Sequence, residues 1–180
     1  MMHSPEALPR MSPNEYLVYE KDQPVRHELV DGYLYAMTGA SDRHEEIALN
    51  LAAALRMHLR GTPCRVYKSD LKIRISDDFY YPDVFVRCGK ERGDPYFKTD
   101  PVFVAEVLSP GTQRYDRGDK RLAYLSLPSL QEYALIAQDR MQVELFRREA
   151  ASVSERMEKP DDLLRLESVD FTMALAELYE

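Results

Sequence analysis

The amino-acid sequence predicts a mixed α/β fold in which a central β-sheet is flanked by helices. Between residues 41 and 59, apolar side chains recur at steps of three and four, which is typical of an amphipathic helix. Short apolar stretches with the spacing of strands follow, then a second helical segment and two further strands. Runs of strands between two main helices favour a mixed sheet covered by helices. The chain of 180 residues is expected to form a single domain over 1–180.

The N-terminal third is expected to contain a short helix, a hairpin and a longer helix. Ser12 can cap a helix and Glu15 follows three residues later, so a short helix should run to about Glu20. Two apolar segments flank the dipeptide at 31–32, Asp-Gly, which is a strong signal for a tight β-hairpin. The long helix should begin near Ser41, and the Gly-Thr-Pro sequence at 61–63 should end it.

The rest of the chain is expected to alternate between strands, polar loops and two helices. A second main helix fits 116–126, with polar stretches at 89–100 and 149–162. The chain should close with a short strand near Leu164 and a helix over 172–178. The other expected strands are 65–67, 71–75, 83–87, 102–108, 132–137 and 142–147, with turns at 77–78 and 139–140.

Composition excludes several classes of protein. No apolar run approaches the roughly 18 residues needed to cross a bilayer, and residues 1–16 lack the apolar segment of a secretion signal. We therefore expect a cytoplasmic protein that contacts no membrane. Cys64 and Cys88 lack metal-ligand spacing and are expected to be reduced thiols. The net charge of −7 argues against a protein that coats nucleic acid through bulk positive charge, although a local basic groove stays possible.

Two acidic residues lie at apolar strands, where carboxylates are uncommon. Asp83 follows Pro82 at the start of one expected strand, and Glu106 lies inside another, between Ala105 and Val107. A buried carboxylate is costly unless it is paired or binds a metal. Two carboxylates on neighbouring strands can share Mg²⁺, which prefers oxygen ligands and keeps several waters. A lysine reaching the same site would neutralise developing negative charge, which is the logic of metal-dependent phosphodiester hydrolysis.

Several motifs together resemble one known group of proteins. They are HELVDG at 27–32, YYPDVFV at 80–86, VAEVLSPGT at 104–112, DRGDKRLAY at 116–124 and QEYALI at 131–136. The combination is similar to the PD-(D/E)XK nuclease superfamily, and more closely to its Uma-type branch of "putative restriction endonucleases". The resemblance extends from about Ser12 to Ala150. It implies a restriction-endonuclease-like core with an extra N-terminal helix and β-hairpin.

The resemblance also implies roles for particular residues. The superfamily places a lysine two residues after the second acid, where this chain has Leu108. In the Uma-type branch a lysine on the following helix takes that role, and Lys120 occupies the matching place. The same resemblance makes Glu28 a third acid at the metal, beside Asp83 and Glu106. His44 and Asp70 are weaker candidates for the site. His44 is expected to lie at the surface or next to the helix cap.

The helix that carries Lys120 is expected to point one side at the carboxylates. Positions one turn apart face the same way, so Asp116, Lys120 and Tyr124 should share that side, while Leu122 and Leu125 face the core. Asp116 is also expected to cap or shape the start of the helix. Residues that could flank a phosphate are Arg117, Arg121 and Tyr124.

The resulting expectation is a Mg²⁺- or Mn²⁺-dependent DNA endonuclease that hydrolyses phosphodiester bonds. Asp83, Glu106 and Glu28 would hold the metal, and Lys120 would position or activate the water. Cutting both strands of a duplex favours a homodimer. Three alternatives stay open: a buried ion pair of Glu106 with Lys120 and no metal, a non-catalytic nucleic-acid- or protein-binding module on the same fold, and a structural component of a mobile-element or toxin-type system.

Overall fold

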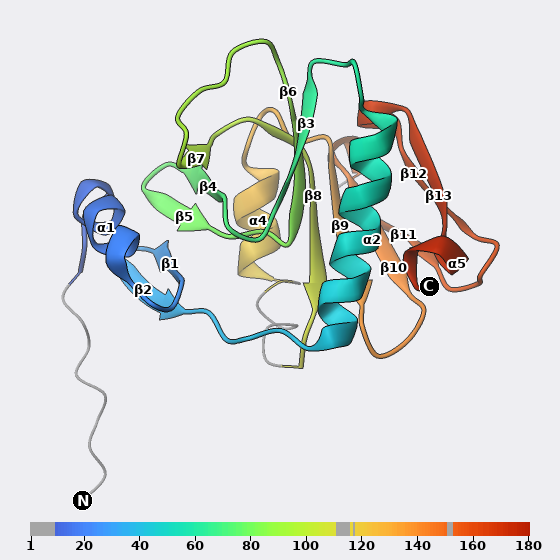
Figure 1. The fold of residues 1–180 in the computed structure, drawn as a ribbon, viewed down its shortest axis with the longest axis horizontal. Coiled ribbons are helices and arrows are strands. Elements are labelled where there is room, and N and C mark those ends of the chain that lie inside the picture. The colour runs from blue at the N-terminus through green and yellow to red at the C-terminus, as the bar shows by residue number, and fades with distance from the viewer. Residues whose placement is uncertain (1–9, 111–115, 117, 151–152) are drawn as a thin grey trace, which may run out of the picture.

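The computed structural model describes residues 10–110, 116, 118–150 and 153–180 of the chain (Figure 1). Its α-helices are α1 (Pro13–Tyr19), α2 (Asp42–His58), α4 (Asp119–Leu125) and α5 (Leu175–Leu178), and its 3-10 helices are η1 (Glu20–Asp22), η2 (Arg148–Ala150) and η3 (Glu167–Val169). Its strands are β1 (His27–Val30), β2 (Tyr33–Ala36), β3 (Cys64–Lys68), β4 (Lys72–Ile75), β5 (Asp78–Tyr80), β6 (Val84–Cys88), β7 (Phe97–Lys98), β8 (Pro101–Leu108), β9 (Glu132–Ala137), β10 (Val143–Arg147), β11 (Ser154–Met157), β12 (Leu163–Leu166) and β13 (Phe171–Ala174).

The strands of this described part form a six-stranded, a five-stranded and a two-stranded sheet. The six-stranded sheet has the order β11-β10-β9-β8-β6-β3 and is mixed, because β8 and β9 run parallel while the other pairs are antiparallel. The five-stranded sheet has the order β2-β1-β5-β4-β7, and the small sheet joins β12 to β13. The predicted mixed α/β architecture is confirmed.

Helices cover both faces of the six-stranded sheet, and the alternation of β8 decides which side chains meet which helix. Phe103, Ala105 and Val107 pack in one apolar cluster with the buried face of α2. Val104 and Leu108 belong to a second cluster that contains Tyr124 of α4. In Figure 1, α2 lies in front of this sheet and α4 behind it. Residue 106 shares the face of 104 and 108, so its side chain is directed towards α4.

The N-terminal hairpin is part of the second sheet rather than a separate addition to the core. Ser12 caps α1 in a reciprocal capping box with Glu15, as predicted. The hairpin β1–β2 turns at 31–32, and β1 then pairs with β5 through Leu29 and Phe79. Leu29, Phe79 and Tyr16 form a small core that fixes α1 on this sheet. β1 thereby lies next to the segment that leads from β5 into β6.

Some expected boundaries are wrong. The turn before Tyr80 lies one residue earlier than expected, because Ser76 takes a left-handed conformation and β5 begins at Asp78. Within the expected polar loop 89–100, β7 adds to the five-stranded sheet, parallel to β4. Within the expected polar stretch 149–162, β11 adds to the six-stranded sheet, antiparallel to β10. Both are short strands at the edges of their sheets, and their sequences contain polar and charged residues, so they show no apolar run.

The end of the chain also differs from the expected helix over 172–178. Phe171 and Met173 are buried while Thr172 is exposed, and this period of two belongs to strand β13. The helix α5 occupies only the second half of the segment. Leu164 lies in β12, as expected, and pairs with Met173.

The expectation of two reduced thiols is wrong in this structure. Cys64 and Cys88 face each other in the antiparallel register of β3 and β6, with Cα atoms 3.9 Å apart, and they form a disulfide. The cross-link ties the edge strand of the six-stranded sheet to its neighbour. In the part of the chain that the structure describes, no helix is long and apolar enough to span a bilayer.

Candidate active site

Asp83 and Glu106 lie next to each other, as the sequence predicted. The antiparallel register pairs Val84 with Ala105, so the next pair outward brings Asp83 opposite Glu106. The Val107 amide donates a hydrogen bond to Oδ2 of Asp83 at 2.7 Å, and the Asp83 amide donates to Oε2 of Glu106 at 3.4 Å. These contacts cross the two strands and hold the two carboxylates side by side.

Lys120 reaches the same place from the first turn of α4. Its Nζ lies 2.9 Å from Oε1 of Glu28 and 3.0 Å from Oε1 of Glu106, with Oδ1 of Asp116 at 3.8 Å. One turn later, the hydroxyl of Tyr124 donates to Oε1 of Glu106 at 3.2 Å. All five of these side chains are buried. The side of the helix that was expected to face the carboxylates does face them.

The opposite side of α4 was predicted less well. Leu122 is 62% exposed, whereas Leu125 is partly buried against the core. Successive helix residues turn by about 100°, so position 122 lies about 200° from both Lys120 and Tyr124. The side that carries Lys120 and Tyr124 is itself the buried one. Leu122 therefore faces away from the protein interior.

Glu28 joins the site from the other sheet. The backbone N–H of Tyr81 donates to its Oε1 at 2.9 Å, and that same oxygen contacts Lys120. Tyr81 stands two residues before Asp83, so the chain segment that leads into β6 ties β1 to the carboxylates. Glu28 thus contacts the ammonium of Lys120 directly.

His44 also belongs to the site, although it is only a weak candidate from the sequence alone. It lies in the first turn of α2, where its N–H donates to the capping hydroxyl of Ser41. Its ring is buried, with Nε2 3.2 Å from Oδ2 of Asp83. Burial alone would lower the pKa of His44, but the hydrogen bond and charge of Asp83, with Glu45 nearby, outweigh it and raise the pKa.

The remaining candidates divide between the site and the surface. Asp70 is exposed and pairs with Arg26 at 3.3 Å, so it lies outside the cluster. Asp116 is buried beside Lys120, and the N-cap position of α4 belongs to Gly118, two residues later. The guanidinium of Arg121 lies over the ring of Phe146, 4.6 Å from its centroid. Arg117 lies outside the described residues.

The electrostatics of the cluster are dominated by unbalanced negative charge. The acids Glu28, Asp83, Glu106 and Asp116 surround one ammonium and one imidazole in the described part of the chain. Burial raises the pKa of Glu106 well above its usual range, and the charges of Asp83, Asp116 and Glu28 add to the rise against the attraction of Lys120. For Lys120, burial is outweighed by Glu106 and Glu28, so its pKa is raised and it stays an ammonium.

The donor set fits a divalent cation that two carboxylates hold. Mg²⁺ is usually bound by one or two carboxylates and completes its coordination with waters. Asp83 and Glu106 supply such a pair. Among the described residues, no three His, Cys, Asp or Glu side chains are grouped closely enough to form a fuller metal site. Lys120 stands between Glu106 and Glu28, which explains why these acids do not converge on one point.

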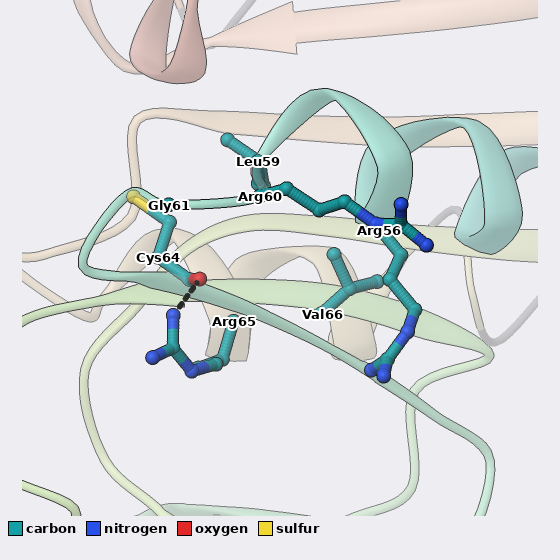
Figure 2. A pocket seen from close by; sticks show the side chains of 7 residues that line it. All are labelled: Arg56, Leu59, Arg60, Gly61, Cys64, Arg65 and Val66. Carbon is teal, nitrogen blue, oxygen red and sulfur yellow. Dashed lines mark hydrogen bonds between the residues drawn. The ribbon is translucent and has the colours of Figure 1, made fainter.

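A second feature, a pocket of about 210 Å³, lies at the other end of α2. Fifteen residues of helix separate its Leu59 from His44, which corresponds to about 22 Å. Arg56, Arg60 and Arg65 line it, but Figure 2 shows their guanidinium groups pointing in different directions. Arg65 donates to the backbone carbonyls of Thr62 and Cys64, at 2.8 Å each. This pocket has no contact with the carboxylates.

The mixed α/β fold, with buried acids on strands and a lysine that reaches them from helix α4, is that of a nuclease-like protein. The chain belongs to the Uma2 family, described as "Putative restriction endonuclease", whose model matches residues 13–176. Two uncharacterized proteins from Synechocystis sp. are similar in sequence. The protein slr1290 is 42% identical, and the match covers 80% of this chain and 78% of slr1290. The protein sll1609 is 30% identical, and the match covers 74% of this chain and 78% of sll1609. A solved structure from Anabaena variabilis, a putative nuclease belonging to DUF820, has a TM-score of 0.79, 18% identity, and covers 94% of this chain and 97% of its own. At this identity the likeness shows the fold alone.

Proposed function

We propose that this protein is a metal-dependent endonuclease that hydrolyses phosphodiester bonds in DNA. The observation that carries the proposal is the excess of buried carboxylates around Lys120, with a raised pKa at Glu106. Burying several acids at one place is expensive unless a cation compensates them. Membership in the Uma2 family and the nuclease-like fold support the same conclusion.

Asp83 and Glu106 would hold the cation, which is Mg²⁺ or Mn²⁺. They occupy opposed positions on adjacent strands, and hydrogen bonds of the two backbones fix both carboxylates. A divalent cation held by these two residues would supply a Lewis acid that favours ionisation of water and offsets negative charge on a phosphate oxygen. Glu28 stays a proposed third ligand. Its contacts with the Tyr81 amide and the Lys120 ammonium restrict the positions that its carboxylate can take.

Lys120 would act as a fixed positive charge and hydrogen-bond donor. Because its pKa is raised, it remains protonated and therefore cannot accept a proton from water near neutral pH. Its ammonium is held by Glu28 and Glu106 from two sides, which orients the third N–H. In this place it would orient the attacking water and offset charge that develops on the phosphate. Positioning, rather than activation, is the role that the geometry favours.

His44 would position Asp83. Its Nε2 contacts the same oxygen of Asp83 that accepts the Val107 amide, so two donors fix that oxygen when the ring carries its proton there. The carboxylate of Asp83 would then be held in one orientation for a cation. This is the common arrangement in which partners of a metal ligand set its orientation.

Plasmid cleavage tests the proposal. Supercoiled plasmid would be incubated with the purified chain and Mg²⁺ or Mn²⁺, with EDTA as the metal-free comparison. The Asp83→Asn variant keeps the shape of the side chain and removes its charge, so it should abolish nicking. Asp77→Asn is the matched control, because Asp77 is 82% exposed and pairs only weakly with Arg74, at 3.6 Å.

Two results would separate the outcomes. Metal-dependent cutting by the parent protein and by Asp77→Asn, but not by Asp83→Asn, supports the proposal. Equal behaviour of parent and Asp83→Asn on double- and single-stranded substrates, with both metals, would reject it. The melting temperatures of all three proteins need to be recorded, so that a loss of fold is not mistaken for a loss of chemistry.

A second candidate function is a binding module that cuts nothing. It is favoured by one observation: Lys120 already sits between Glu28 and Glu106, so an ion-paired cluster exists without any metal. Such a module would bind nucleic acid or protein equally well in EDTA and after Glu106→Gln. Binding that requires Mn²⁺ and the Glu106 carboxylate would reject this alternative.

A further inference from the structure

A pocket of about 440 Å³ lies between the end of α1 with η1 on one side and β4 with β7 on the other. This volume falls within the range of about 300–1,000 Å³ that is usual for small-ligand sites. Its walls combine the rings of Tyr81, Tyr96 and Phe97 with the cationic side chains of Lys21, Arg26 and Lys72. Its other lining residues are Leu17, Glu20, Asp70, Leu71, Asp94 and Pro95.

Lys72 lines this pocket and is buried, and only part of the hydrogen-bonding capacity of its ammonium is used. Its residue is 9% exposed, and its Nζ donates to the hydroxyl of Tyr81 at 3.2 Å. An ammonium has three N–H donors, and the described residues provide no second hydrogen-bond partner for it. Burial lowers the pKa of Lys72 against the attraction of Glu20. An anion arriving in the pocket would find a buried cation with free donors.

Among the acids that attract Lys72, which are Glu20, Asp94 and Asp70, the one with the largest effect is already engaged. Glu20 accepts the backbone N–H of His27 at 2.8 Å and the hydroxyl of Tyr81 at 3.1 Å, and its second oxygen contacts the His27 ring at 3.1 Å. Its carboxylate therefore holds Tyr81 and His27 in place rather than pairing with Lys72. The cation at the base remains available for a ligand.

The rim of the pocket offers a flat apolar surface and further cations. The side chain of Tyr96 is exposed, at 58%, and Lys21 lies over its ring, 5.4 Å from the centroid. Arg26 stands at the opening and pairs with the exposed Asp70. A nucleobase stacks readily on an exposed aromatic ring, whichever base it is. A phosphate suits a lysine at the base, with a rim arginine as a second donor.

Tyr81 links this pocket to the carboxylates. Its hydroxyl contacts Lys72 and Glu20 inside the pocket, and its backbone N–H donates to Glu28, which contacts Lys120. Tyr81 therefore contacts residues of both sites, through its side chain in the pocket and through its backbone at Glu28. A ligand bound in the pocket would be connected to Glu28 and Lys120 through this one residue.

We propose that this pocket, the Lys72 pocket, binds a nucleoside monophosphate unit, with the phosphate on Lys72 and the base on Tyr96. The inference rests on the proposed nuclease function. The unit comes either from a free mononucleotide or from the strand that lies next to the cleaved bond, and the chemistry of recognition is the same in both cases. A simple carboxylic acid would leave the aromatic wall unused.

Calorimetric titration tests this assignment in EDTA, where neither metal binding nor cleavage contributes. The probes are deoxyadenosine monophosphate, inorganic phosphate and a single-stranded deoxyhexanucleotide. Lys72→Met keeps the unbranched stem of the side chain. It should weaken the affinity for the mononucleotide by about tenfold or more, since a hydrogen bond to a charged group is lost. Tyr96→Ala changes an exposed position and should not disturb folding. It should lower the affinity for the mononucleotide and leave the affinity for inorganic phosphate unchanged. Lys159→Met, on an exposed turn, is the control and should bind like the parent protein.

The outcomes separate both the ligand source and the two proposals. Lys72-dependent binding of the mononucleotide identifies a free ligand, and Lys72-dependent binding of the hexanucleotide alone identifies the strand. Equal affinities of the parent and Lys72→Met for every probe, or no binding by the parent, would overturn the assignment. If plasmid cleavage fails while Lys72-dependent binding holds, the pocket stands and the nuclease proposal falls.

Discussion

Replacing Lys120 by methionine tests whether the buried cluster is held together by charge. Methionine keeps the unbranched stem and removes the ammonium that lies 2.9 Å from Glu28 and 3.0 Å from Glu106. Removing one partner of a buried ion pair costs about 3–5 kcal/mol, because the other charge stays buried without compensation. In a domain of this size each kcal/mol shifts the melting temperature by about 2–4 °C, so a fall of roughly 6–20 °C is expected.

Urea unfolding at pH 7 in EDTA, followed by circular dichroism, measures this cost. The control is Lys159→Met, an exposed lysine whose removal should change the free energy of unfolding by less than about 0.5 kcal/mol. Repeating the measurement in Mn²⁺ should recover part of the loss, because a cation again faces the acids. A loss below about 1 kcal/mol for Lys120→Met in EDTA would refute the reasoning, since the acids would then be stable without their cation.

Three further predictions concern other parts of the molecule. Replacing both Cys64 and Cys88 by alanine should lower the free energy of unfolding by about 3–4 kcal/mol in urea, because the disulfide closes a loop with a sequence separation of 24; an unchanged midpoint would contradict this. The pKa of Asp162 is lowered by the amides of Lys159 and Glu158, so the stability of that turn is present above the ordinary value of 3.8 and is lost as the pH falls through the lowered pKa. The hydrogen-exchange protection factors of those two amides, taken relative to the rate of an unprotected amide at the same pH, should therefore fall only in that acidic range, and a fall already at pH 6 would contradict it. Light scattering should give twice the chain mass of 20.9 kDa at micromolar concentration, and a mass near 20.9 kDa would reject the homodimer.

The central pair of the site, Asp83 and Glu106, could be predicted from the sequence because an acidic residue is unusual in or next to the apolar run of a buried strand. Glu106 interrupts an apolar run and Asp83 opens another, and both strands proved adjacent in the antiparallel register. Lys120 required the resemblance to a family, because nothing in the residues alone tells which lysine reaches a given strand. Its helical partner Tyr124 followed from the spacing of one turn.

The rest of the cluster depended on contacts between distant segments. His44 looked like a residue near a helix cap, and only the packing of α2 on the sheet brings its ring to Asp83. Glu28 lies on a strand of the second sheet, and the backbone of Tyr81 places it beside Lys120. Tertiary contacts of this kind leave no periodic signal in the sequence.

Errors at the ends of elements have a similar origin. The segment 172–178 contains both apolar alternation and a helix, and a short window does not separate the two periods. The apolar character of Leu122 predicts that it faces the core. Because the side of α4 that carries Lys120 is the buried side, Leu122 lies on the opposite side and is exposed. Here a charged residue, and not a leucine, occupies the inner side of the helix.

The account rests most directly on a divalent cation shared by Asp83 and Glu106. Titration calorimetry with Mn²⁺ on the parent protein, Asp83→Asn and Glu106→Gln measures this, with Asp77→Asn as the exposed control. We expect one Mn²⁺ site per chain in the parent protein and in the control, and no site in either of the other two variants. Absence of binding to the parent protein, or binding that survives Asp83→Asn and Glu106→Gln unchanged, would contradict the account.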